Sequence, residues 1–103
     1  MNYTGSVYSI EQSNHFADWL AGLRDSKARL RITARIVMAG EGNFGDCEPV
    51  GEGVHEMRIH VGAGYRAYFI YRGRRMVFLL CGGDKASQKR DITKAKDMAK
   101  ALG

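Results

Sequence analysis

The sequence predicts an α+β fold in which two N-terminal helices pack on a small antiparallel sheet, in the order β-α-α-β-β-β-α. Apolar residues recur at helical spacing between residues 10 and 39, and they alternate with polar residues between residues 53 and 72. A lysine-rich amphipathic segment follows near residue 90. The 103 residues, of which 45% are hydrophobic and 26% charged, are expected to form a single domain over 1–103, because about 100 residues is a usual domain size.

The N-terminal region predicts a short strand followed by a helix. The segment Tyr3 to Tyr8 alternates and is bounded by turn-forming residues, which is typical of a strand. Ser9 lies three residues before Gln12, the capping-box spacing that begins a helix. An apolar stripe at positions i, i+3, i+4 and i+7 then follows, formed by Phe16, Trp19, Leu20 and Leu23. The pattern therefore predicts an amphipathic helix over Ile10 to Leu23.

A second helix is expected over Lys27 to Ala39, with Asp25 or Ser26 as its cap and Gly40 as its limit. The segment Gly40 to Gly45 matches G-x-G-x-x-G in letters. It follows a helix and no helix opens after it, so a dinucleotide-binding function is not supported. Five acidic residues and no basic residue lie between Glu41 and Glu56. This acidic stretch is expected to face solvent or to pair with basic residues elsewhere.

The second half of the chain predicts a three-stranded antiparallel meander and a final helix. Gly53 to Val61 and Tyr65 to Arg72 both alternate, and the glycine turn at residues 62–64 suits a hairpin between them. Met76 to Cys81 is a continuous apolar run, typical of a strand that is buried on both faces. Ser87 is the predicted cap of the last helix, which reaches Leu102.

Charge and motif content narrow the possible functions. Residues 1–57 hold five basic and eight acidic residues, whereas residues 58–103 hold eleven and three, giving net charges of −3 and +8. A basic half favours a nucleic acid or an acidic protein as partner. There is no apolar run of membrane length and no signal-peptide pattern, so a cytoplasmic location without membrane association is expected. Two cysteines without a CxxC motif and three scattered histidines predict no metal site and no cofactor.

A candidate site is predicted on the sheet face opposite the helices. That face carries the side chains of Glu56, Arg58, His60, Arg66 and Tyr68. We take Arg58, His60, Arg66 and Tyr68 as candidate catalytic residues, and we take as candidate RNA or phosphate ligands Lys85, Gln88, Lys89 and Arg90. Arginine grips phosphate, tyrosine stacks on an unpaired base and histidine exchanges protons near neutral pH. The set suits RNA cleavage by attack of a 2′-hydroxyl on the adjacent phosphate. The alternative is a cross-strand ladder in which Glu56 neutralises Arg58 or Arg66.

Several segments, taken in order along the chain, carry a resemblance to a known family. They are Phe16-Ala17-Asp18-Trp19-Leu20, Leu23-Arg24-Asp25, Ala34-Arg35-Ile36, Gly42-Asn43-Phe44-Gly45-Asp46, Gly53-Val54-His55-Glu56-Met57-Arg58, Gly64-Tyr65-Arg66-Ala67-Tyr68, and Leu79-Leu80-Cys81-Gly82-Gly83-Asp84-Lys85 with Gln88. In their order and spacing they resemble the RelE/ParE superfamily of bacterial toxins. The sequence is most similar to the HigB-like branch, also called addiction-module killer proteins, with residues 53–58 matching its Glu-Leu-Arg pattern.

This resemblance implies the toxin of a type II toxin–antitoxin module, with two helices packed on an antiparallel sheet. It implies growth arrest by ribosome-dependent cleavage of mRNA, and neutralisation by a cognate antitoxin protein. Arg66 matches the arginine that grips the scissile phosphate, Arg58 matches the arginine of the Glu-Leu-Arg pattern, and Lys85 matches the lysine after the last strand.

One departure from the family pattern leaves alternatives open. Many ribonuclease members carry a tyrosine or histidine after the last strand, and the segment Ile92 to Leu102 has neither. A metal-independent endoribonuclease would then use His60 or Tyr68 for proton transfer. A first alternative is ParE-like poisoning of DNA gyrase, which needs binding rather than phosphodiester chemistry. A second is a non-catalytic basic module that docks an acidic protein.

Overall fold

The computed structural model, which describes residues 3–103, has an α+β fold with a central six-stranded sheet. The strand order is β1-β2-β6-β5-β4-β3. In chain order the elements are β1 (Tyr3–Thr4), β2 (Ser9–Gln12), α1 (Asn14–Ala21), α2 (Ser26–Gly40), β3 (Cys47–Gly51), β4 (Val54–Ile59), β5 (Tyr65–Arg72), β6 (Met76–Asp84), the 3-10 turn η1 (Lys85–Ser87) and α3 (Gln88–Leu102).

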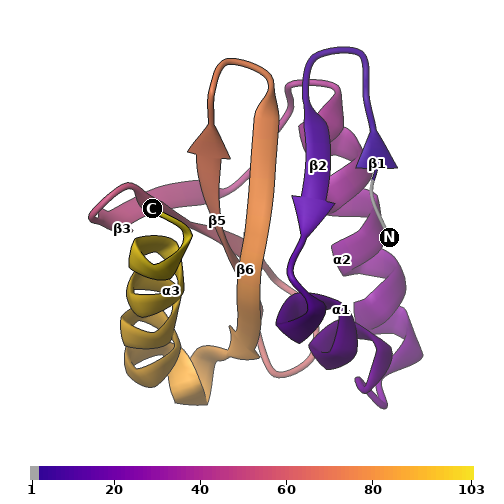
Figure 1. Ribbon diagram of the computed structural model, residues 1–103. Coiled ribbons are helices and arrows are strands. Elements are labelled where there is room, and N and C mark those ends of the chain that lie inside the picture. Colours follow the sequence, from indigo (N-terminus) through magenta and orange to yellow (C-terminus); the bar gives the residue numbers. More distant parts are fainter. Residues whose placement is uncertain (1–2) are drawn as a thin grey trace.

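Helices cover both faces of this sheet. Helices α1 and α2 lie on one side and α3 on the other (Figure 1). The α+β class agrees with the sequence prediction. The prediction of a small antiparallel sheet with helices on one face is wrong. The sheet is larger and mixed, because β2 pairs with β6 in parallel, and α3 closes the face that was expected to be open.

The N-terminal boundaries differ from those predicted by sequence. Residues 9–12 form β2 rather than the first turn of a helix, and Ile10 is buried against Val77 of β6. Helix α1 begins after Ser13, whose Oγ accepts a hydrogen bond from the Phe16 amide at 2.9 Å. A parallel pairing with a distant strand leaves no local pattern, and the Ser9–Gln12 spacing imitates a helix cap.

Strand β3 lies inside the acidic stretch and was not predicted. Its composition is poor for a strand, since it contains Pro49 and Gly51. It forms the edge of the sheet beside β4, where the missing N–H of a proline is tolerated. The expectation that this stretch pairs with basic residues is confirmed: Glu52 contacts Lys96 at 3.7 Å and Lys100 at 3.2 Å.

The second helix and the meander β4-β5-β6 follow the prediction closely. Asp25 caps α2 by accepting a hydrogen bond from the Ala28 amide at 3.1 Å. The helix buries one stripe against the sheet, formed by Ala28, Ile32, Ile36 and Ala39. Each of its two buried isoleucines contributes roughly 1.5–3 kcal/mol by leaving water. Ile32, Ile36 and Ala39 belong to the larger core, which also holds Met57 and Phe69 of the sheet.

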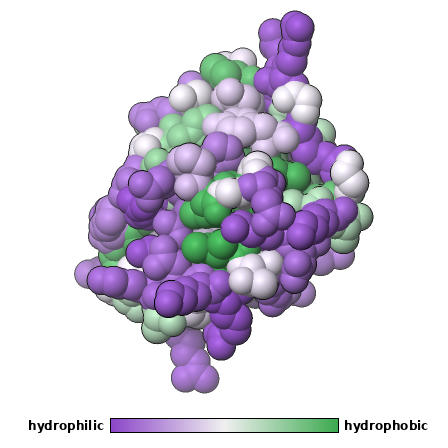
Figure 2. All heavy atoms as spheres, turned by 90° about the vertical axis from the view of Figure 1, so that its left-hand side faces the viewer, coloured by the Kyte–Doolittle hydropathy of each residue, from purple (hydrophilic) through white to green (hydrophobic). Residues whose placement is uncertain are grey.

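A smaller core lies between the sheet and α3. It is formed by Val54, Tyr68, Leu80, Cys81 and Ala95. An irregularity in the β5–β6 pairing, where Tyr68 opposes Cys81 and Phe69 opposes Leu79, places the extra residue Leu80 in this core. The surface on this side is mainly hydrophilic, with a small apolar patch near its centre (Figure 2). Within residues 3–103, no helix has the length and apolar character required to cross a bilayer.

Candidate functional site

Four of the predicted site residues line one hollow at the end of the β4–β5 hairpin. The hollow has a volume of about 410 Å³ and is lined by Arg58, His60, Arg66 and Lys85 together with the turn at residues 61–65. We call it the Arg66 hollow. Arg58 and Arg66 oppose each other across β4 and β5, and Lys85 directly follows β6. Gly62 (φ 54°) and Gly64 (φ 77°) supply the positive φ angles of the turn.

A buried carboxylate organises the floor beneath this hollow. Glu56 is only 1% exposed. Its Oε1 accepts a hydrogen bond from Arg58 Nε at 3.1 Å, and its Oε2 lies 3.8 Å from Arg66 Nε. The same Oε2 accepts hydrogen bonds from Tyr68 Oη at 3.1 Å and from Gln88 Nε2 at 2.9 Å. The cross-strand ladder predicted that Glu56 would neutralise Arg58 or Arg66, and the carboxylate contacts both. Two neutral donors, Tyr68 and Gln88, hold the carboxylate in turn.

The two arginines differ in how far their charge is balanced. Arg58 contacts Asp46 at 3.5 Å and Glu48 in addition to Glu56. Within residues 3–103, Arg66 has Glu56 as its sole carboxylate contact, and its Nε makes no hydrogen bond. The exposed Lys85 forms no ion pair with any described residue. Arg66 and Lys85 are therefore the cations of this hollow with the greatest capacity for an added anion.

His60 lies at the rim in contact with a carboxylate. Its Nε2 is 2.6 Å from Asp46 Oδ2, and its side chain is 74% exposed. The hydrogen bond from His60 lowers the pKa of Asp46; desolvation opposes this effect, and the charge of Arg58 adds to it. Asp46 thus stays ionised and orients the imidazole ring, an arrangement suited to proton transfer.

Arg35 positions Asp46, a role that sequence reasoning missed. Its Nη2 donates a hydrogen bond to the Phe44 carbonyl at 2.9 Å, and its Nη1 donates to the Arg58 carbonyl. The guanidinium lies against Gly45, where a Cβ atom would come within 2.9 Å of Arg35 Nη2. The arginine thereby ties the glycine-rich loop to β4. The one sign of this contact in the sequence is the position of Arg35, a charged residue next to the buried Ile36.

Four predicted residues lie elsewhere than expected. Tyr68 was placed on an open sheet face, but α3 covers it completely. Burial, followed by the charge of Glu56, raises the pKa of the Tyr68 phenol, so it stays a neutral donor. Gln88 donates to Glu56 rather than lining the hollow. Lys89 is exposed on α3, and Arg90 lines a separate hollow beside Trp19.

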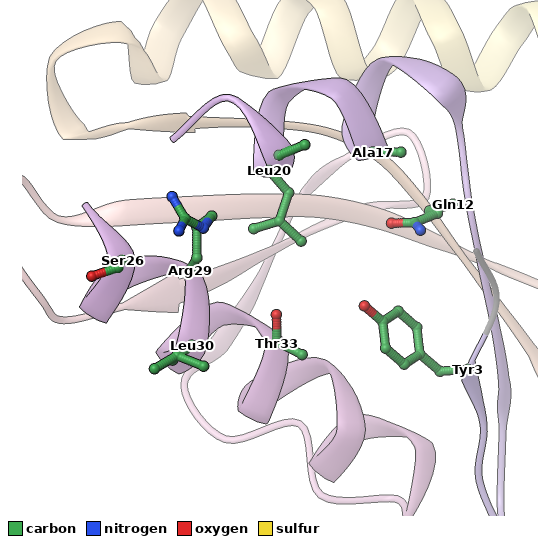
Figure 3. A pocket seen from close by; sticks show the side chains of 9 residues that line it. Tyr3, Gln12, Ala17, Leu20, Ser26, Arg29, Leu30 and Thr33 are labelled. Carbon is green, nitrogen blue, oxygen red and sulfur yellow. The ribbon is translucent and has the colours of Figure 1, made fainter. Parts of the chain in front are cut away.

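A larger hollow, of about 530 Å³, lies between α1, α2 and the N-terminal strands. Figure 3 shows Tyr3, Leu20 and Thr33 around its opening. Its one lining arginine, Arg29, donates a hydrogen bond to the Leu23 carbonyl. The Arg66 hollow, which several cations line, is therefore a better candidate for anion chemistry than the hollow in Figure 3.

Neither cysteine belongs to the Arg66 hollow. Cys47 and Cys81 are both free thiols. Burial raises the pKa of Cys81 to about 12, so it remains a protonated packing residue. Among residues 3–103, no group of three or more His, Cys, Asp or Glu side chains is arranged to hold a metal ion.

Comparison with known proteins places the chain in a family. The profile of the family described as "Phage derived protein Gp49-like (DUF891)" matches residues 18–102, a span that includes every residue lining the Arg66 hollow. An uncharacterized protein of Haemophilus influenzae is 46% identical over 94 residues, which cover 91% of this chain and 95% of that protein. The chain therefore belongs to the Gp49-like family of phage-derived proteins, a family associated with toxin–antitoxin systems.

Proposed function

We propose that this protein is the toxin of a bacterial type II toxin–antitoxin module and that it arrests growth by metal-independent cleavage of mRNA on the ribosome. The observation that carries this proposal is the convergence of Arg66, Lys85 and the His60–Asp46 pair on one accessible hollow. Membership of the Gp49-like family supports the toxin assignment. The sequence resemblance to the HigB-like branch of the RelE/ParE superfamily supports the cleavage chemistry.

The proposed reaction is an internal transesterification of RNA. The 2′-hydroxyl loses its proton and attacks the adjacent phosphorus while the bond from phosphorus to the 5′-oxygen breaks. A 2′,3′-cyclic phosphate and a protonated 5′-hydroxyl result. Arg66 and Lys85 stabilise the charge that develops on the non-bridging oxygens. His60, which Asp46 orients, accepts the proton of the 2′-hydroxyl and donates a proton to the leaving 5′-oxygen. Glu56, Tyr68 and Gln88 position Arg66 from below rather than touching the RNA.

The proposal is tested by inducing the protein alone and mapping the 5′ ends of cellular mRNA. The native protein should arrest growth and create codon-linked ends. Arg66→Ala should lower cleavage about 100- to 1000-fold, because it removes a donor to the developing charge. Arg72→Ala is the matched control, since it removes the same charge from an exposed position at the other end of β5.

Each alternative has its own outcome in this experiment. If the Arg66→Ala protein cleaves mRNA as fast as the native protein does, Arg66 does not stabilise the developing charge. Growth arrest with DNA damage and intact mRNA indicates the gyrase-poisoning alternative. Normal growth on induction of the native protein indicates a non-catalytic binding module.

We propose an acidic, apolar segment of a cognate antitoxin as the protein partner. The outer face of α2 exposes Leu30 (73%), Val37 (50%) and Met38 (46%). Lys27 and Arg31 are exposed on the same helix, which contains no acidic residue. An apolar stripe flanked by cations is complementary to an amphipathic helix with acidic flanks. The hollow in Figure 3 continues this surface, since Leu30 also lines it.

A further inference from the structure

A second hollow adjoins the Arg66 hollow, and Tyr65 lines both. It has a volume of about 320 Å³. Its walls come from α1, the end of β6 and the first turns of α3, and include His15, Trp19, Gly82, Gly83, Arg90 and Lys94. We call it the Trp19 pocket.

Two glycines allow aromatic and acidic side chains to lie directly on the strand. A Cβ atom at Gly82 would be 2.3 Å from Trp19 Cζ3, and one at Gly83 would be 1.8 Å from Asp91 Oδ2. Trp19 in turn meets Tyr65, with ring centroids 6.4 Å apart and planes inclined at 61°. The pocket therefore has an aromatic wall that reaches to the edge of the Arg66 hollow.

The polar groups of the Trp19 pocket are arranged in two zones. Asp91 is only 8% exposed, and its Oδ2 accepts a hydrogen bond from Ser87 Oγ. Arg90 and Lys94 are exposed on α3 and lie four residues apart, which places them on one helix face. Neither forms an ion pair with any residue of the range 3–103. Acceptors thus lie inside the pocket and unneutralised cations lie at its rim.

We propose that the Trp19 pocket binds a nucleoside unit of single-stranded RNA, next to the unit whose phosphate occupies the Arg66 hollow. This inference rests on the proposed function in taking RNA as the ligand. The base lies against Trp19 and Tyr65, as unpaired bases do on aromatic side chains. Asp91 accepts a hydrogen bond from an amino or hydroxyl group of the nucleoside, and Arg90 and Lys94 contact the following phosphate.

The arrangement explains why Arg90 lies away from the Arg66 hollow. An RNA strand that passes over Tyr65 brings successive units to two different hollows. The predicted phosphate contacts of Arg90 and of Lys85 then belong to different nucleotides of one strand. Recognition of the base in the Trp19 pocket would give the cleavage reaction a sequence preference.

Trp19 is the one tryptophan of the chain, so its fluorescence reports directly on this pocket. The probes are a hexameric 2′-O-methyl RNA, which cannot undergo attack by a 2′-hydroxyl, and adenosine monophosphate. Both should change the fluorescence of the full-length native protein saturably. The double variant Arg90→Ala with Lys94→Ala should raise the Kd of the hexamer about 10-fold. The matched control Lys96→Ala with Lys100→Ala removes two charges at the same spacing from α3 and should stay within about twofold.

Failure of this inference is separable from failure of the proposed function. Absence of a saturable fluorescence change, or equal Kd values for the two double variants, overturns the Trp19 pocket as a nucleoside site. Arg66→Ala should weaken binding of the hexamer but leave the fluorescence response to adenosine monophosphate unchanged. Loss of both responses in this variant also overturns the Trp19 pocket as a nucleoside site. A native protein that binds the hexamer through Arg90 and Lys94 but cleaves no mRNA supports the pocket and contradicts the nuclease.

Discussion

At the scale of single residues, the buried Glu56 determines the geometry of the candidate site. A carboxylate that is 1% exposed is tolerated because cations and hydrogen-bond donors replace its hydration. Arg58, Tyr68 and Gln88 supply the hydrogen bonds. Arg66 remains 3.8 Å away, so its guanidinium is held in place yet keeps capacity for another anion.

Removal of the Glu56 carboxylate should therefore destabilise the protein more than removal of one of its donors. Glu56→Ala leaves two partly buried arginines without their shared counter-charge and should lower the free energy of unfolding by about 3–5 kcal/mol. Tyr68→Phe, the milder comparison, removes one hydrogen bond to a charged group and should lower it by about 1.5–3 kcal/mol. Urea denaturation at pH 7 measures both. A Glu56→Ala protein at least as stable as Tyr68→Phe contradicts this role of Glu56.

At the scale of elements, the start of α1 shows how two similar local signals compete. Ser9 and Ser13 both precede an apolar stripe, but Ser13 alone acts as the cap of α1. Ser13 Oγ also donates to the Leu80 carbonyl at 2.6 Å, which ties the helix to β6. Residues 9–12 are drawn into the sheet by pairing with residues 76–79. The tertiary contact therefore decides which serine begins the helix.

This assignment predicts unequal effects of two serine substitutions. Ser13→Ala should lower the free energy of unfolding by about 1–2 kcal/mol, because it removes the cap bond to the Phe16 amide. Ser9→Ala, the matched control, should change it by less than about 0.5 kcal/mol, because no cap depends on Ser9. Thermal denaturation followed by circular dichroism compares the two proteins. A larger effect of Ser9→Ala than of Ser13→Ala would show that Ser9 is the cap of the helix, as the sequence alone predicts.

At the scale of the whole molecule, charges from the two halves of the chain meet in space. The acidic stretch contributes Glu52 to an ion-pair cluster with Lys96 and Lys100 of α3, and it contributes Asp46 to the rim of the Arg66 hollow. These contacts neutralise part of the basic half. Arg66 and Lys85 keep the capacity to bind an added anion. The exposed cations of α2 lie in the half of the chain whose net charge is negative.

The proposed antitoxin surface gives a prediction at this scale. Leu30→Glu should prevent rescue of growth by the antitoxin, because it places a charge in an apolar contact, and it should weaken the complex at least about 10-fold. Growth arrest by Leu30→Glu alone should match that of the native protein. Thr93→Glu on the exposed side of α3 is the matched control and should be rescued normally.

The measurement combines growth on co-expression with the protein encoded by the neighbouring reading frame and titration calorimetry of the purified pair. Normal rescue of Leu30→Glu, with an unchanged Kd, excludes the outer face of α2 as the docking surface.

Much of the fold could be predicted because its strongest signals are local. Asp25 capping α2 and the glycine turn at residues 62–64 both depend on neighbours in sequence. The alternation in β4 and β5 also placed Arg58 beside Arg66, as the observed register confirms. These features arise from backbone geometry and side-chain period, which a short segment expresses by itself.

The remaining features depend on which distant segments meet. Parallel pairing of β2 with β6, the edge strand β3 and the placement of α3 on the second sheet face leave little trace in local pattern. By itself, the sequence determined the apolar stripe of α1, the meander and the pair of opposed arginines. The tertiary structure decided that Tyr68 is a buried donor and that Arg66 keeps capacity for an anion, because burial and ion pairing depend on what covers a side chain rather than on its neighbours in the chain.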